Sequence, residues 1–292
     1  DKVLPDENRM INGFTDYEEL TRTRRLIMRS YKLPGNRLRL LHPNENRGAV
    51  TIDEERDYHF RYVLEDNFGN RRTYQFIVKG KRQDIPEYKP ETNEMLYWNR
   101  TNVIQKPGME LVVPRYYVYE DVPLRTDMRG DSSHIAFDYI LDAGRTPIHS
   151  YCDLSIGLRH MPVADTTKYY IVQKAGKWRS SMGGKYANGW IKTRVRSLGT
   201  FSVDVDTIAP QITPIGQGGW RTSRNIRFRI KDMESGIGSY KVYIDGKFVL
   251  FGLKKGILVI QDPEKVKKGV SHKLEVTVTD QCGNMTRKEY KF

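Results

Sequence analysis

His134 and Asp138 have the spacing in this sequence that is closest to that of a metal site. The pattern H-x-x-x-D lets one imidazole and one carboxylate approach the same zinc ion. A catalytic zinc also needs a third protein ligand and an open position for water. No two histidines are spaced as H-x-H, the six being His42, His59, His134, His149, His160 and His272. We therefore predict no catalytic, cofactor-binding or metal-binding residue in this chain, and expect His134 and Asp138 to be sheet residues on one face.

Other acidic residues have a spacing that is more typical of turns than of metal binding or catalysis. Asp232, Glu234 and Asp245 could hold calcium in a loop, but they lack EF-hand spacing, so we expect them to form turns. The sequence contains no G-x-S-x-G elbow, no P-loop, and no G-x-G-x-x-G between a strand and a helix. None of the common nucleophile or nucleotide motifs is therefore present.

The composition is that of a basic, folded protein. The 292 residues carry 49 Lys and Arg against 36 Asp and Glu, a net charge of +13, and 38% are hydrophobic. Such a charge attracts polyanions, but the basic residues are spread along the chain and match no nucleic-acid module. We expect no nucleic-acid partner and no transmembrane segment. Because the chain starts at Asp1 without a signal peptide, we expect a mature or excised piece of a longer protein.

The last stretch of the chain sets the pattern for the rest. Apolar residues alternate in short runs, for example Leu274, Val276 and Val278, which is typical of strands with one buried face. Turn residues such as Asp245-Gly246 and Gly283-Asn284 separate these runs. Short strands with regular turns indicate an antiparallel sandwich. We predict an immunoglobulin-like module over residues 204–292.

The closing hairpin of that module has a counterpart near the N-terminus. When Asp66 is aligned with Asp280, Gly69-Asn70 falls on Gly283-Asn284, and alternating apolar residues precede both turns. Ahead of this first copy, a Thr15–Glu18 capping box and apolar residues at helical spacing predict an amphipathic helix near 16–31. Short alternating runs at 38–40 and 50–52 suggest further strands. We predict a partial or modified immunoglobulin-like module over residues 1–83.

We predict a central β-sandwich-like module over residues 84–203. A charged segment with two prolines, 84–90, is a plausible linker into it. Trp178 and Trp190 favour core positions over a groove. Cys152 and Cys282 are too few and too far apart for a disulfide framework, so we expect free thiols. The predicted fold is thus mostly β, with tandem immunoglobulin-like β-sandwich modules and one N-terminal amphipathic helix.

Short elements along most of the chain carry a family resemblance. They are Leu33-Pro34-Gly35-Asn36 with Leu38, Gly183-Gly184, Leu198-Gly199-Thr200-Phe201, Asp206-Thr207 with Pro210, Ser235-Gly236-Ile237 with Tyr240, Ile244-Asp245-Gly246-Lys247, and Asp280 with Gly283 and Asn284. In this order they resemble the C-terminal, non-catalytic β-rich region of Gram-negative lysostaphin-type (LytM-like) zinc metallopeptidases. In that family an upstream domain with H-x-x-x-D and H-x-H ligands cuts peptidoglycan cross-links.

The resemblance implies a role in the cell envelope. It implies a periplasmic or outer-membrane-associated protein of a Gram-negative bacterium, with zinc only in an upstream peptidase domain. The leading hypothesis is a non-catalytic accessory region that positions or targets the peptidoglycan hydrolase, with peptidoglycan or another envelope protein as partner. An alternative is a structural scaffold that docks a protein partner through exposed strand edges. A third reading is a hydrolase in its own right that uses His134 and Asp138.

Overall fold

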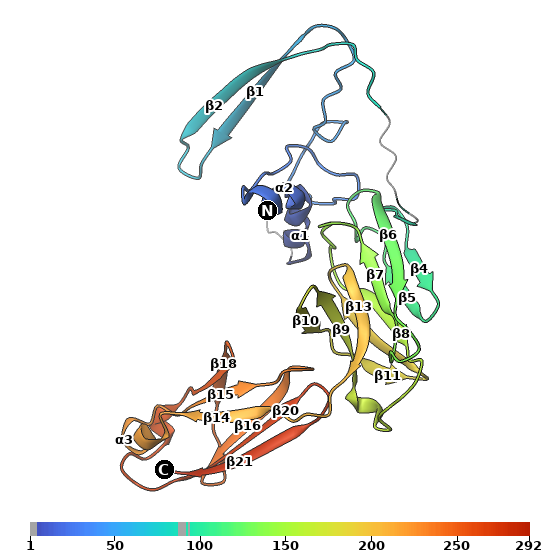
Figure 1. Ribbon diagram of the computed structural model, residues 1–292. Helices are drawn as coiled ribbons and strands as arrows, with labels where there is room; N and C mark the ends of the chain where they lie inside the picture. The colour runs from blue at the N-terminus through green and yellow to red at the C-terminus, as the bar shows by residue number, and fades with distance from the viewer. Residues whose placement is uncertain (1–4, 87–91, 93) are drawn as a thin grey trace. The chain divides into compact units, whose positions relative to one another are not determined.

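Antiparallel β-sheets make up most of this protein, and the helices are short (Figure 1). The computed structural model describes residues 5–86, 92 and 94–292. The chain divides into two compact units, Asp1–Glu91 and Thr92–Phe292. The expected fold class, mostly β with sandwich modules and an N-terminal helix, is confirmed. Among the described residues, no helix has the length and hydropathy that a membrane span requires.

The first unit contains short helical segments and one hairpin. Its elements are α1 (Pro5–Met10), η1 (Ile11–Phe14), α2 (Tyr17–Thr23), β1 (Asp57–Glu65) and β2 (Arg71–Lys79). Helix α2 is shorter than the helix expected near 16–31. It begins after Asp16, whose carboxylate accepts the Glu19 N–H at 2.9 Å, so Asp16 and not Thr15 is the cap. It ends because Arg24 adopts a left-handed conformation with φ 63°.

The segment between α2 and β1 forms no strands among the described residues, so the strands suggested at 38–40 and 50–52 are absent. Leu38 is buried instead, as are Leu33, Met10 and Phe14. Asn36 fixes this packing, because its amide donates to the Met10 carbonyl at 2.9 Å and its side-chain oxygen accepts the Leu38 N–H at 3.1 Å. The apolar alternation here reflects side chains placed by turns rather than a β ladder.

Strands β1 and β2 form a two-stranded antiparallel sheet by themselves. Their turn matches the turn that follows Asp280. The Asp66 carboxylate accepts the N–H groups of Phe68 and Asn70 at 2.8 and 3.0 Å. The Asp280 carboxylate accepts the N–H groups of Cys282 and Asn284, both at 2.8 Å. In each turn the Asn amide also donates to the second Asp oxygen at 2.8 Å. The internal repeat seen in the sequence is therefore a repeat of structure.

The second unit begins with a sandwich of two sheets. Its strands are β3 (Glu94–Leu96), β4 (Asn102–Lys106), β5 (Met109–Val113), β6 (Val122–Arg129), β7 (Asp138–Asp142), β8 (Cys152–Gly157), β9 (Tyr169–Ala175), β10 (Trp178–Ser181), β11 (Lys185–Ala187), β12 (Trp190–Val195) and β13 (Gly199–Val205), with η2 at Thr166–Lys168. The orders are β10-β9-β13-β7-β6-β3 and β11-β12-β8-β5-β4. Alternate residues such as Leu111, Leu154 and Phe201 are fully buried in one core.

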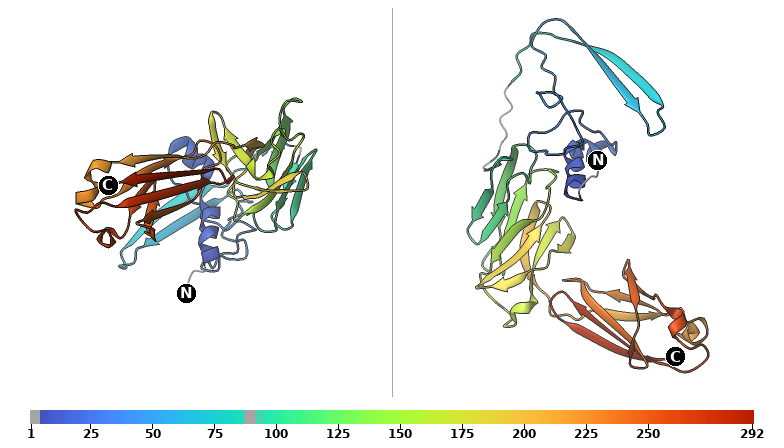
Figure 2. Two further views of the ribbon diagram at one scale, coloured as in Figure 1. Left: turned by 90° about the horizontal axis from the view of Figure 1, so that it is seen from below. Right: turned by 180° about the vertical axis from the view of Figure 1, so that it is seen from behind.

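A second sandwich follows after strand β13 (Figures 1 and 2). Its elements are β14 (Gln211–Ile215), η3 (Gln217–Gly219), α3 (Trp220–Ser223), β15 (Arg227–Lys231), β16 (Ile237–Ile244), β17 (Lys247–Phe248), β18 (Phe251–Lys254), β19 (Ile257–Ile260), η4 (Pro263–Lys265), β20 (Lys273–Asp280) and β21 (Met285–Lys291). The sheets have the orders β14-β15-β19-β18 and β17-β16-β20-β21. Trp220, Phe228 and Val276 are fully buried in their shared core.

Candidate functional site

The structure separates His134 from Asp138 in both environment and partners. His134 lies in a turn before β7, so the expectation that both residues belong to the sheet is wrong for His134. Its Nδ1 is 2.9 Å from the Asp131 carboxylate. Hydrogen bonds from Ser133, and from His134, hold the pKa of Asp131 well below its usual range. Asp138 instead accepts a hydrogen bond from Lys174 Nζ at 2.5 Å. Among the described residues, no histidine belongs to a cluster of metal-ligating groups.

The acidic residues considered for calcium also have separate partners. Asp245 lies in the turn after β16 with φ 49°, and its carboxylate is 2.6 Å from His272 Nδ1. Glu234 accepts a hydrogen bond from the Tyr170 hydroxyl at 3.3 Å. Asp232 alone joins a larger group, together with two aspartates that lie far from it in the sequence.

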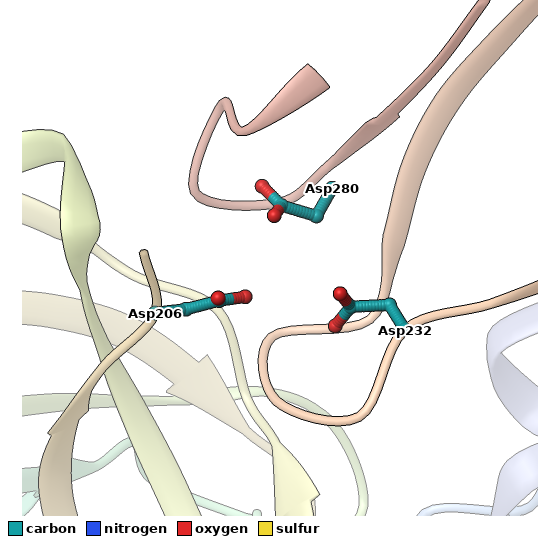
Figure 3. Close-up of side chains that lie close together, drawn as sticks. All are labelled: Asp206, Asp232 and Asp280. Atoms are coloured by element: carbon teal, nitrogen blue, oxygen red, sulfur yellow. The ribbon is translucent and has the colours of Figure 1, made fainter. Parts of the chain in front are cut away.

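Three carboxylates, from Asp206, Asp232 and Asp280, converge at one end of the second sandwich (Figure 3). Ligand oxygens of the three lie within 4.8 Å of one another. Asp206 and Asp280 are buried, and Asp232 is partly buried. Each side chain begins a turn: Asp206 follows β13, Asp232 follows β15, and Asp280 ends β20. The cluster therefore joins the segment that connects the sandwiches to two turns of the second sandwich.

Backbone and side-chain donors surround the Asp206 carboxylate. One oxygen accepts the N–H and the hydroxyl of Ser235 at 3.0 and 2.5 Å, and the other accepts the Ile208 N–H at 2.9 Å. The Asp206 carbonyl accepts the Asn284 amide at 3.0 Å. Asp232 accepts the N–H groups of Glu234 and Gly236 at 3.0 and 2.7 Å. Donors from all three turns thus stabilise the charges at the junction.

Burial and repulsion between carboxylates affect pKa values in this cluster. Burial raises the pKa of Asp280, and the nearby Asp206 charge raises it further, against the opposing effect of hydrogen bonds from Asn284 and Cys282. Burial also raises the pKa of the Cys282 thiol to about 11. Lys168 supplies a nearby positive charge, since its Nζ donates to the Cys282 carbonyl at 3.0 Å. The cluster is therefore held by hydrogen-bond donors and one ammonium group.

Contacts from η2, β9 and β10 continue this junction onto the first sandwich. Tyr170 and Val172 form a small buried cluster with Cys282. The Tyr170 hydroxyl donates to Glu234, and Lys168 binds the Cys282 carbonyl. Ser181 Oγ lies 3.5 Å from the Gln281 side-chain oxygen. Apolar burial and directed hydrogen bonds thus join the two sandwiches at this junction.

The contacts of this arrangement are hydrogen bonds that join three turns. The same three carboxylates offer oxygen ligands, which is the ligand type that calcium prefers. Burial moves the pKa of the Cys282 thiol further from neutral, which disfavours the thiolate. The expectation of free cysteines is confirmed, as neither Cys152 nor Cys282 forms a disulfide. We find a hydrogen-bonded junction where the sequence had suggested separate turns.

Sequence reasoning placed Asp232 and Asp280 in turns but missed that they meet Asp206. The sequence signal is local to two of them: Asp232 and Asp280 each precede a Ser, Gly or Asn that can adopt a turn conformation, whereas Asp206 precedes Thr207 and Ile208. The core expectation for Trp178 is wrong, since its side chain is 81% exposed beside the turn between β9 and β10. Trp220, which the sequence analysis did not single out, fills the core of the second sandwich.

Comparisons with known proteins give one family match, to the first sandwich, and structural neighbours of low similarity. No curated protein sequence matches the chain. One similar solved structure is a glycoside hydrolase domain, Endo-D from Streptococcus pneumoniae R6, at 13% identity and a TM-score of 0.21, covering 58% of this chain and 35% of that one. Another is a Ca²⁺-stabilised adhesin from an Antarctic bacterium, at 10% identity and a TM-score of 0.20, covering 81% of this chain and 80% of that one. Neither score supports a functional argument. Residues 93–206, which span the first sandwich, match the family of Zu5-like domains.

Proposed function

We propose that this chain is a non-catalytic, β-rich region that holds neighbouring parts of a cell-envelope protein in a fixed arrangement. The observation that carries the proposal is the junction at Asp206. The buried Asp206 carboxylate there binds the turn at Ser235, and its main-chain carbonyl binds Asn284 in the turn after β20. Tyr170 and Lys168 of the first sandwich contact the same two turns. Such a junction stabilises one orientation and makes the pair of sandwiches suitable as a spacer.

Spin-label distances in the full chain test this proposal. Labels are attached at Val103→Cys in β4 and Lys254→Cys in β18, both at exposed positions. The native thiols stay unlabelled because burial raises the pKa of Cys152 to about 12 and that of Cys282 to about 11. We expect a narrow distance distribution that broadens on Asp206→Ala. The control Lys174→Met removes a comparable contact within the first sandwich, to Asp138, and should leave the distribution narrow. A broad distribution in the unmodified chain would contradict a fixed spacer.

We further propose that the parent protein is a lysostaphin-type peptidoglycan hydrolase and that this region targets it to the envelope. The short glycine-containing elements of the sequence support this proposal, as does the net charge of +13. A shallow cavity of about 660 Å³ on the first sandwich is lined by three basic residues, Lys185, Lys192 and Arg194, beside Glu110 and Asp153. These three exposed cations lie close enough together to contact one acidic polymer.

Retention on purified peptidoglycan at low and high salt tests the targeting role. We expect binding at low ionic strength that weakens with salt, because exposed charges are screened. The double variant Lys192→Glu and Arg194→Glu should reduce retention. The matched control, Lys241→Glu with Lys254→Glu, makes the same change in net charge on the second sandwich and should not. No retention at low salt, or equal losses in both variants, would reject targeting through this cavity.

A further inference from the structure

The hairpin of β1 and β2 exposes an apolar face. One face of the hairpin carries alternate residues of β1, namely Tyr58, Phe60, Tyr62 and Leu64. The partners across from the first three on β2 are, in the same order, Val78, Phe76 and Tyr74. Phe60 and Phe76 stack with ring centroids 5.1 Å apart. Yet Tyr62, Leu64 and Tyr74 are 41%, 66% and 65% exposed. An amphipathic two-stranded ribbon of this kind is marginal in water unless something covers it.

The second copy of the hairpin shows what covers such a ribbon. Strand β20 corresponds to β1, and its residues Leu274, Val276 and Val278 are fully buried against the facing sheet. Strand β16 pairs with the edge of β20 that lies away from β21, placing Val242 opposite Val276. Strand β1 has only β2 beside it among the residues that the structure describes. Within the described residues of the first unit, this copy thus lacks an equivalent of β16 and of the facing sheet.

The free edge of β1 has hydrogen-bonding groups directed outward. The Asp66 N–H donates to Asn70 across the turn, so alternation directs the N–H groups of Arg61 and Val63 away from β2. In the second copy, the outward Gln281 N–H donates to Gly236, the residue directly before β16. The edge therefore has the polarity that accepts an antiparallel strand.

The charge of Arg61 and the area of the exposed face indicate what kind of strand would bind at this edge. Arg61 is exposed and has no ion-pair partner among the described residues, so a carboxylate on the adjacent strand would complement it. Two such ribbons face to face would cover only about 600 Å² in total, from strands about 4.8 Å apart that rise about 3.3 Å per residue. A stable interface needs at least about 1,000 Å². A second copy placed face to face is therefore too small to form a stable interface, whereas a strand added at the free edge also gains main-chain hydrogen bonds.

We propose that the free edge of β1 accepts an antiparallel strand from a partner protein, with apolar residues beside Phe60, Tyr62 and Leu64 and a carboxylate opposite Arg61. Strand β16 supplies the template for that strand, because the register places Tyr243 opposite Glu275, which corresponds to Arg61. This inference concerns the first unit and does not depend on the spacer or targeting roles.

Two synthetic peptides test the proposal on the full chain. Both have the sequence of residues 236–245, with glutamate in one and lysine in the other at the position of Tyr243. Fluorescence anisotropy should show that the glutamate peptide binds, and that the lysine peptide binds about fivefold to tenfold more weakly. Arg61→Glu should reverse that preference. This reversal does not depend on hydrophobic substitutions, which can unfold the hairpin.

A matched pair of variants locates the binding face. Tyr62→Ser should weaken binding at least about tenfold, because it removes a cross-strand aromatic contact. Ile77→Ser, at a 52% exposed position on the opposite face of β2, should leave it unchanged. Failure of both peptides to bind would overturn the proposal, as would an unchanged preference in Arg61→Glu. Sedimentation velocity tests the alternative that a second copy of the chain binds at this edge. A dimer of the unmodified chain that dissociates in Tyr62→Ser would assign the edge to a second copy instead.

Discussion

At the scale of single residues, Asp206 shows how one buried charge organises a junction. The side chain is fully buried and accepts hydrogen bonds from Ser235 and Ile208. In Asp206→Ala these donors lose their acceptor, so we expect a loss of about 2–3 kcal/mol in the free energy of unfolding, measured with urea. Asp165→Ala is the control, because Asp165 makes the same pair of bonds to Thr167 at an exposed site. Its loss should stay below about 1 kcal/mol. Equal losses would mean that burial at the junction adds nothing.

His272 gives the same sandwich a dependence on pH. Its Nδ1 is 2.6 Å from the Asp245 carboxylate and its Nε2 is 2.7 Å from the Lys267 carbonyl, so both nitrogens must donate. Burial lowers the pKa of His272, but these two acceptors together raise it above the ordinary value of 6.5. The stabilisation is therefore fully present below about pH 6.5 and is lost as pH rises through the raised folded-state pKa.

Urea unfolding between pH 5.5 and 8.5 checks this sign. The difference in unfolding free energy between the unmodified chain and His272→Gln should shrink as the pH rises. Asp245→Asn should weaken the same pH dependence, because it removes the carboxylate beside Nδ1. A difference that grows with pH would show that the buried imidazole is neutral in the folded state.

At the scale of elements, a bulge in β16 shapes the edge of the second sandwich. The register with β20 shifts between Ile237 and Ser239, and Gly238 lies at the shift. A Cβ on Gly238 would lie 2.5 Å from the Asp280 carbonyl oxygen, a backbone atom that cannot easily move. Gly238→Ala should therefore cost about 1–3 kcal/mol in urea unfolding. Gly218→Ala, where a Cβ meets nothing within 4 Å, is the control and should change little.

Elements also show what the sequence could predict. Period-two alternation with turn residues located β20 and β21, because each residue type there agrees with its local geometry. The predicted helix near 16–31 was too long, because apolar residues continue at helical spacing past Arg24. In the structure the backbone of Arg24 is left-handed and ends the helix, and Met28 pairs with Thr15 in a β-bridge. The meeting of Asp206, Asp232 and Asp280 could not be predicted, since it depends on how three turns stack in space.

At the scale of the whole molecule, the two copies of the hairpin separate local geometry from tertiary support. Their turns have the same hydrogen bonds, from Asp66 in one and Asp280 in the other. Only β20 and β21 belong to a four-stranded sheet with a buried face. Because packing rather than the turn supplies most of the stability of such a ribbon, the two copies should open with very different free energies.

Hydrogen exchange measured by mass spectrometry on the full chain tests this difference. Amides of β20 should exchange only with global unfolding of the second sandwich, whereas amides of β1 should exchange through local opening at least about a hundredfold faster. Addition of the glutamate peptide should slow exchange in β1 and leave β20 unchanged. Equal protection of both copies without peptide would mean that the aromatic face of the hairpin is already covered in solution. Since β1 and β20 share a turn and a register, any remaining difference in protection measures what a covering sheet contributes.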